Sequence, residues 1–427
     1  MSVQTTLLPN GLTIVSETMN HLESVSLGVW IKSGSRNEKH NEHGVAHMLE
    51  HMAFKGTAGR SAREIVEQVE NVGGDVNAAT SLETTSYYAR VLKDDVALGV
   101  DILHDILTHS VLDEGEMKRE KHVILQEIGA SKDSPEDLVY DHFQSAAFHK
   151  QALGRSIMGT PDTVNSFQPD NLRSFLNNHY HGPNMVLSCA GAMEHEALVK
   201  LAGERFAEFN STQTSEAEEG AYIGGQQLEK RDLMEAQIML GFEGRAYHAR
   251  DFYASQLLAT VLGGGMSSRL FQEVREKRGL CYSIHAFHWG FSDTGVFGIH
   301  AATGDDDIEE LMPVILEQLQ NVGDHIEQSE VDRARAQISA GLLMSLESPA
   351  SRAGQIARQV LLFGRPIPNE ELLERLNAIT PTRLADLAQR LFTSSTPTLA
   401  SIGPIEKLMR QEELCERLGI SSSVAAQ

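Results

Sequence analysis

The sequence predicts an α+β fold built from two related domains, each a β-sheet with helices packed on one face. Two observations support this. Segments with helix and strand patterns follow one another in a similar order in the two halves, and a polar segment divides the chain almost in half. That segment, residues 210–225, is rich in Glu and Gly and lacks apolar periodicity. We therefore expect a first domain over residues 1–210, a linker over 211–225 and a second domain over 226–427.

The expected elements follow from apolar periodicity and from turn residues. A strand, a tight turn and a second strand are expected around residues 7–12. In the first half the patterns predict helices over 45–54, 95–108 and 113–131, and a strand over 84–92. In the second half they predict helices over 251–262, from 308 onward and over 329–346, with strands between 282 and 302. The three glycines 263–265 either end a helix or form a mobile loop, and residues 421–427 are expected to fray.

Composition excludes several classes of protein. The chain has 427 residues, 41% of them hydrophobic, which is enough for a large core. Its formal charge of −23 disfavours a nucleic-acid binder and would attract basic ligands. No apolar run is long enough for a transmembrane helix, and the first ten residues lack the regions of a signal peptide. Three widely spaced cysteines form no disulfide framework, so we expect a reducing, cytoplasmic location.

The most informative residues are His47, Glu50 and His51, which form an H-x-x-E-H arrangement within a predicted helix. Residues four apart share a helix face, so the two imidazoles can converge on one metal ion. Two histidines at this spacing suit zinc, and the neighbouring carboxylate can take a proton from water at the metal. Isolated, such histidines could equally be core residues paired with Glu50.

A catalytic zinc site needs a third protein ligand, and the candidate is Glu127. Glu120 lies seven residues earlier, so both carboxylates fall on one helical face about two turns apart. Their neighbours are largely apolar, and a buried carboxylate there requires a cation. Solvated surface charges are the alternative interpretation.

The second half provides an internal control for these residues. By alignment of the two halves, the positions of the five polar residues are occupied by residues that cannot bind a metal in the same way: Ser255, Leu258, Ala259, Ala334 and Gly341. A purely structural role would be expected in both halves. The comparison therefore favours one zinc ion per chain, held in the first domain.

Residues 44–57 resemble the signature of the pitrilysin and mitochondrial processing peptidase family, the inverzincins, over its whole length. The likeness is greatest to the catalytic, beta-type processing peptidase subunits and their bacterial single-chain relatives. It implies zinc held by His47, His51 and Glu127, with Glu50 as the general base. Glu120 is then expected to hydrogen-bond to a ligand histidine. His43 stands where the family usually has Asn.

Residues 263–283 resemble the family's second-domain signature. The resemblance implies that Arg275 and Tyr282 reach the zinc site, Tyr282 as a donor to the oxyanion and Arg275 as an orienting group. A surface pair is the alternative. It further implies a clamshell of two domains, a homodimer or a pair with a related subunit, and peptide binding by strand addition along Asn77, Ala78, Ala79 and Thr80.

Three hypotheses remain open at this point. The first is a zinc metalloendopeptidase that cuts extended, basic, presequence-like peptides. The second is a non-catalytic scaffold subunit of the same fold, like the core proteins of the respiratory bc1 complex. The third is a structural zinc protein, which would need a fourth ligand and no base at Glu50.

Overall fold

The computed structural model describes residues 3–209 and 217–420, which form two compact units. The first unit comprises residues 1–129, 156–218 and 343–367, and the second comprises residues 130–155, 219–342 and 368–427. The first half of the expected linker and the expected frayed end, residues 421–427, fall outside the described residues. No helix of the described part is long and apolar enough to cross a membrane.

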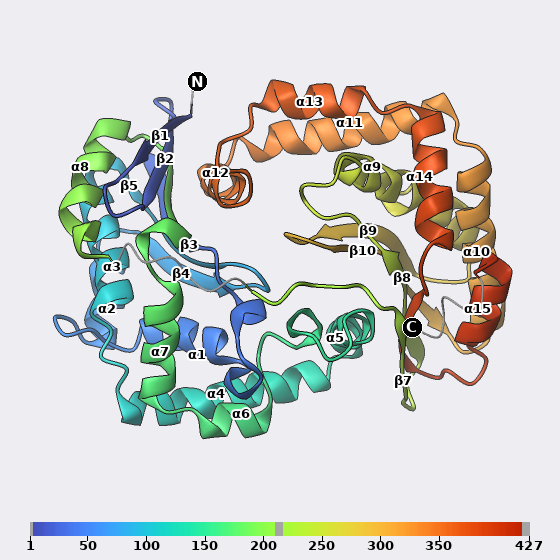
Figure 1. Ribbon diagram of the computed structural model, residues 1–427, viewed down its shortest axis with the longest axis horizontal. Helices are drawn as coiled ribbons and strands as arrows, with labels where there is room; N and C mark the ends of the chain where they lie inside the picture. Colours follow the sequence, from blue (N-terminus) through green and yellow to red (C-terminus); the bar gives the residue numbers. More distant parts are fainter. Residues whose placement is uncertain (1–2, 210–216, 421–427) are drawn as a thin grey trace. The chain divides into compact units, whose positions relative to one another are not determined.

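The first unit contains a six-stranded mixed sheet (Figure 1). Its strands, in spatial order, are β1 (Gln4–Leu7), β2 (Thr13–Thr18), β6 (Met185–Gly191), β3 (Ser24–Ile31), β5 (Thr85–Leu92) and β4 (Asp75–Thr80). β2 and β6 run parallel, and every other neighbouring pair is antiparallel. In β5, buried positions alternate with more exposed ones, the period expected of a strand with one face against a core.

The second unit contains a five-stranded sheet with the same topology as five strands of the first. Its order is β7 (Gly225–Lys230), β11 (Thr398–Gly403), β8 (Glu235–Glu243), β10 (Gly295–Gly304) and β9 (Ser283–Gly290). β7 and β11 are again the parallel pair, and the other neighbours are antiparallel. The duplication predicted from the sequence, and with it the α+β class, is therefore confirmed.

Most helices of each unit lie on one face of its sheet (Figure 1). The helices of the first half are α1 (Val45–Ala53), α2 (Ala62–Glu70), α3 (Val96–Thr108), α4 (Glu114–Lys132), α5 (Pro135–Ala147), α6 (Pro161–Ser166), α7 (Pro169–His179) and α8 (His195–Arg205). Those of the second half are α9 (Phe252–Gly263), the π-helix η7 (Phe271–Glu276), α10 (Ile308–Asp324), α11 (Gln328–Ser345), α12 (Pro349–Phe363), α13 (Asn369–Asn377), α14 (Pro381–Thr393) and α15 (Gln411–Leu418). Short 3₁₀ turns are η1 (Ser35–Asn37), η2 (His40–Glu42), η3 (Lys93–Asp95), η4 (Ala152–Gly154), η5 (Gly182–Asn184) and η6 (Phe206–Glu208). The predicted helices agree with these bounds to within about two residues. α9 ends at Gly263, with Gly264 as its C-cap.

The other face of each sheet is covered by a helix from the opposite half of the chain, which the sequence did not indicate. α5 packs on β11, β7 and β8, and α12 packs on β6, β3 and β2. Both helices begin alike, with a serine N-cap before a proline, Ser134 in α5 and Ser348 in α12. Beneath α12 a separate apolar cluster includes Trp30 and Ile356. The exchange makes each compact unit discontinuous in sequence, and residues 156–218 belong to the first unit whereas residues 219–342 belong to the second.

Candidate metal centre

Helix α1 carries the two histidines of the H-x-x-E-H motif. Its apolar residues are buried, whereas His47 and His51 are half-buried on one side of the helix. Their ring centroids lie 4.7 Å apart, with the rings edge to face. The spacing of four residues therefore brings the imidazoles together as the sequence predicts.

The start of α1 is fixed by a buried carboxylate. Glu38 accepts hydrogen bonds from the backbone N–H groups of Gly44 (2.8 Å) and Ala46 (2.9 Å). An acidic side chain at this end also interacts favourably with the helix dipole. Glu38 thus satisfies N–H groups that the first turn leaves unpaired, and it determines where the histidine-bearing turn begins.

Gly44 is the N-cap of α1 and adopts a left-handed conformation, with φ of 93°. A Cβ atom there would lie 2.8 Å from both the Cα of Gly159 and the carbonyl oxygen of Met158. We expect Gly44→Ala to lower the free energy of unfolding by about 1–3 kcal/mol, because the strained φ and the clash add. Urea unfolding should show a lower midpoint. Gly203→Ala in α8, where a Cβ has open space, is the control and should be neutral or stabilising; equal midpoints for the two variants would contradict the prediction.

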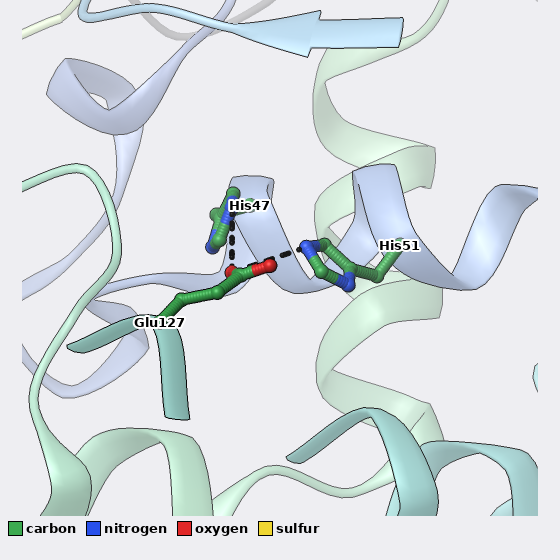
Figure 2. A group of neighbouring side chains, drawn as sticks. All are labelled: His47, His51 and Glu127. Carbon is green, nitrogen blue, oxygen red and sulfur yellow. Dashed lines mark ion pairs between the residues drawn. The ribbon is translucent and has the colours of Figure 1, made fainter. Parts of the chain in front are cut away.

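Helix α4 contributes the third candidate ligand, Glu127. Its Oε2 lies 3.7 Å from Nε2 of His47 and 3.5 Å from Nε2 of His51. Figure 2 shows the carboxylate between the two imidazoles, which point toward it from neighbouring turns of α1. Within residues 3–209 and 217–420, this is the one group of three such ligand atoms that lie within 4.8 Å of one another.

The second nitrogen of His51 has a partner of its own, Glu120. Nδ1 of His51 lies 3.0 Å from Oε2 of Glu120, and Nζ of Lys55 lies 2.7 Å from the other oxygen, Oε1. Burial acts to raise the pKa of Glu120, but the hydrogen bonds from Lys55 and His51 outweigh it and hold the pKa below its ordinary value. An ionised Glu120 accepts a hydrogen bond from the Nδ1–H group of His51, which leaves the Nε2 lone pair of the same ring facing Glu127.

His47 is held in its neutral form. Burial lowers the pKa of His47 to about 4, and the neighbouring His51 adds a smaller decrease. Neutral imidazole is the form that binds metals. In the described part of the chain, the buried Nδ1 of His47 has no hydrogen-bond partner.

This donor set fits zinc. Zinc binds imidazole nitrogen and carboxylate oxygen at about 2.0–2.2 Å, which in a tetrahedron separates ligand atoms by roughly 3.4 Å. The two measured separations to Glu127 are 3.7 and 3.5 Å, close to that value. The three protein atoms leave the fourth position open, as in catalytic zinc sites.

Glu50 lies on the same helix, between the two histidines in sequence, and is half-buried. Its carboxylate forms no ion pair within the described residues. Its charge acts on the phenols of Tyr87 and Tyr180, whose hydroxyl oxygens are 3.1 Å apart. Burial raises the pKa of both phenols, and the charge of Glu50 adds a smaller increase, so both stay protonated at neutral pH.

The predicted substrate strand is the edge strand β4, which contains Asn77, Ala78, Ala79 and Thr80. It pairs with β5 on one side, with Ala78 opposite Tyr87, and no strand of the described residues pairs with its other side. β4 also contacts α1, the helix of the histidines. An edge of this kind can accept an added strand, and its role in substrate binding stays a prediction.

Arg275 and Tyr282 belong to the second unit, where they contact each other. The guanidinium of Arg275, in the π-helix η7, lies 5.2 Å from the ring centroid of Tyr282 and 4.6 Å from that of Phe271. Tyr282 is 77% exposed, so its hydroxyl is available to a ligand. Their participation in the metal centre stays a prediction.

Lys55 and Glu38 are two residues of the site that sequence reasoning missed. Lys55 follows His51 by four residues, the spacing that brought the two histidines together, and this could have indicated a place near the ligands. Its partner Glu120 is 65 residues away, however, so the ion pair itself has no local signal. His43, noted only as a departure from the family, has its Nε2 2.6 Å from the carbonyl oxygen of Ser156.

Both halves of the chain match models of one protein family. Residues 13–161 match the insulinase family, peptidase family M16, and residues 166–338 match the peptidase M16 inactive domain. The three candidate ligands all fall in the first match. An uncharacterized zinc protease of Rickettsia bellii (strain RML369-C) is 40% identical over 398 residues, 93% of this chain and 96% of that protein. The uncharacterized zinc protease YmxG of Bacillus subtilis (strain 168) is 37% identical over 397 residues, 92% and 97% of the two chains.

Two further likenesses reach beyond bacteria. The mitochondrial-processing peptidase subunit beta of Bos taurus is 32% identical over 426 residues, 97% of this chain and 86% of that protein. A chain of complex III2 from Candida albicans, with Inz-5 bound, superposes with a TM-score of 0.87 at 20% identity, covering 98% of this chain and all of that one. At that identity the likeness concerns the fold alone.

The matches to both family models and to these relatives define the class of protein, a family that includes proteins named zinc proteases. It belongs to peptidase family M16. The resemblance first drawn from residues 44–57 and 263–283 is thereby confirmed.

Proposed function

We propose that the chain is a zinc-dependent metalloendopeptidase of the H-x-x-E-H type, with one zinc ion per chain. One observation carries the proposal: the imidazoles of His47 and His51 and the carboxylate of Glu127 converge, while Glu50 on the same helix forms no ion pair with any residue that the structure describes. A structural site would not need such a carboxylate. The names of the bacterial relatives, zinc proteases, point in the same direction.

His47, His51 and Glu127 would hold the ion. Bound zinc would act as a Lewis acid, lowering the pKa of a coordinated water to about 7 and polarising the scissile carbonyl. Glu50 then accepts the proton of the attacking water and delivers it to the leaving amine. Glu120 keeps the ring of His51 oriented through its hydrogen bond to Nδ1.

The other residues would handle the peptide. β4, through Asn77, Ala78, Ala79 and Thr80, binds an extended backbone by strand addition, which reads the main chain and not the sequence. Tyr282 donates a hydrogen bond to the developing oxyanion, and Arg275 orients either the substrate backbone or Tyr282.

The substrates we propose are extended, basic, presequence-like peptides. A chain with a formal charge of −23 attracts cationic peptides over a distance set by ionic strength. We further propose that the protein pairs with a second copy or a related chain, since the bovine relative is named as a beta subunit. A reducing compartment such as the cytoplasm is the proposed location, because Cys189, Cys281 and Cys415 are all buried and unpaired.

The alternative is a non-catalytic scaffold or partner subunit. The fold is shared with a chain of complex III2, but that likeness carries no information about activity. A scaffold subunit would not need the H-x-x-E-H motif on α1 together with a third candidate metal ligand, Glu127, on α4. The two functions differ in one measurable property, metal-dependent cleavage.

The test is a cleavage assay with metal analysis. We expect purified protein to contain close to one zinc per chain and to cleave a basic presequence-like peptide. A chelator should remove both the zinc and the activity, and stoichiometric zinc should restore them, because the three ligands belong to a single site. An acidic peptide of equal length is the control for charge preference. Zinc-free protein that cleaves as fast as the zinc-loaded form, or loaded protein that cleaves nothing, would exclude the proposal.

A further inference from the structure

Lys55, just beyond the end of α1, forms the far end of a hydrogen-bonded chain that leads to the metal ligands. Its Nζ lies 2.7 Å from Oε1 of Glu120, and Oε2 of the same carboxylate lies 3.0 Å from Nδ1 of His51. Each oxygen of Glu120 therefore has a different partner. The Nε2 at the opposite edge of the His51 ring is the atom that faces Glu127.

The carboxylate in the middle of this chain is nearly removed from solvent. The side chain of Glu120 is 8% exposed, that of His51 16% and that of Lys55 31%. A buried carboxylate oxygen without a donor is costly, so Glu120 would turn toward any other donor or toward water. Lys55 occupies one oxygen and thereby leaves the other aimed at His51.

The duplicated half lacks both members of this ion pair. With the offset that places His51 on Ala259, Lys55 corresponds to Gly263, and Glu120 corresponds to Ala334. At Gly263 a Cβ would lie 2.2 Å from the backbone nitrogen of Ala286, so no lysine fits there. The Lys55–Glu120 ion pair therefore occurs in the half of the chain that carries the candidate zinc ligands, and its counterpart is missing from the half that lacks them.

We propose that Lys55 is a positioning residue for zinc binding: by fixing the orientation of Glu120, it holds the His51 ring with Nε2 directed at the metal. The inference rests on the proposed zinc site. It differs from a merely stabilising ion pair in its consequence, because loss of Lys55 should weaken zinc binding through Glu120 and not only lower the melting temperature. Residues that orient a ligand in this way typically affect metal affinity by about 10- to 100-fold.

The experiment measures the zinc dissociation constant of the full chain by competition with a chromophoric chelator, alongside thermal melting of the zinc-free protein. We expect Lys55→Met to weaken zinc binding about 10- to 100-fold, and Lys55→Arg, which keeps a cationic donor, to restore most of the affinity. Lys93→Met removes a similar ion pair in the same unit, that of Lys93 with Glu23 (2.7 Å), and should leave zinc affinity unchanged. At saturating zinc, kcat of Lys55→Met should fall and KM should stay near the wild-type value.

A double mutant tests whether Lys55 acts through Glu120. Lys55→Met combined with Glu120→Gln should bind zinc no more weakly than Glu120→Gln alone. Additive losses, or wild-type zinc affinity in Lys55→Met with a lowered melting temperature, would overturn the proposal. Should the Met variant not fold, Lys55→Gln is compared with Lys55→Arg, and equal affinities for those two would overturn it as well.

Failure of the proposed function gives a different result. Wild-type protein that binds no zinc would end both proposals at the first measurement. Wild-type protein that binds zinc but cleaves no peptide would end the peptidase proposal and leave the role of Lys55 to be decided by the affinities.

Discussion

Glu50→Gln is expected to reduce kcat for a basic peptide by about 10²- to 10⁴-fold while leaving close to one zinc per chain. The amide has nearly the same shape as the carboxylate but cannot accept a proton, and general acid–base groups contribute about 10²–10⁴-fold. Glu50 is not one of the three converging ligand residues, so the metal should remain. The measurement is steady-state kinetics with zinc analysis of the same sample.

Glu70→Gln, at an exposed position in α2, is the matched control and should behave as wild type. Comparable activity in Glu50→Gln and wild type would remove Glu50 from the mechanism. Loss of zinc together with activity would instead indicate that Glu50 helps to hold the metal. Retained zinc without turnover is the result that a structural zinc site does not predict, since such a site has no activity to lose.

The elements that carry the ligands were accessible from sequence because their determinants are local. Apolar residues recur along residues 45–54 and 113–131 with helical period, and the observed helices are Val45–Ala53 and Glu114–Lys132. Strand β5 alternates buried and exposed side chains, as its sequence indicated. The convergence of Glu127 on His47 and His51 also matches the expectation from the spacing and the family resemblance.

The exchange of α5 and α12 has no comparable local signal. Periodicity shows that a helix has an apolar face, but not which sheet that face meets. α12 is anchored to the first sheet by groups far apart in sequence: Arg352 pairs with Glu17, and Ser188 donates a hydrogen bond to the carbonyl of Ala353 (2.7 Å). Such contacts depend on tertiary packing, which is why the expected two-part division of the chain gives no account of them.

The two halves differ in the burial of the residues at the motif positions. In α9 the residues that correspond to His47, Glu50 and His51 are Ser255, Leu258 and Ala259, and all three are buried. In α1 the three polar residues are half-buried, so they remain accessible to a ligand. The corresponding helix face is therefore buried in the second unit and partly exposed to solvent in the first. In the sequence, this difference appears only as the replacement of charged and imidazole side chains by small or apolar ones.

Glu127→Ala is expected to weaken zinc binding on the order of 10²- to 10³-fold. The zinc-binding free energy of a four-ligand site is ~10–16 kcal/mol, and this loss follows if each ligand contributes about a quarter of it. The remaining imidazoles would hold the ion with two nitrogens and no compensating charge. Activity at limiting zinc should fall in parallel. The zinc-induced rise in melting temperature should also largely disappear, because the stabilisation of the folded state by a ligand grows with the logarithm of the binding affinity.

Glu116→Gln, on the same helix but paired with Arg119 at the surface, provides the comparison and should retain wild-type affinity. His47→Ala should resemble Glu127→Ala in affinity, since both remove one ligand atom from a set of three. If Glu127→Ala bound zinc as tightly as Glu116→Gln, the third ligand would have to be another residue. The proximity of Glu127 to both imidazoles would then reflect only side-chain packing around a half-exposed carboxylate.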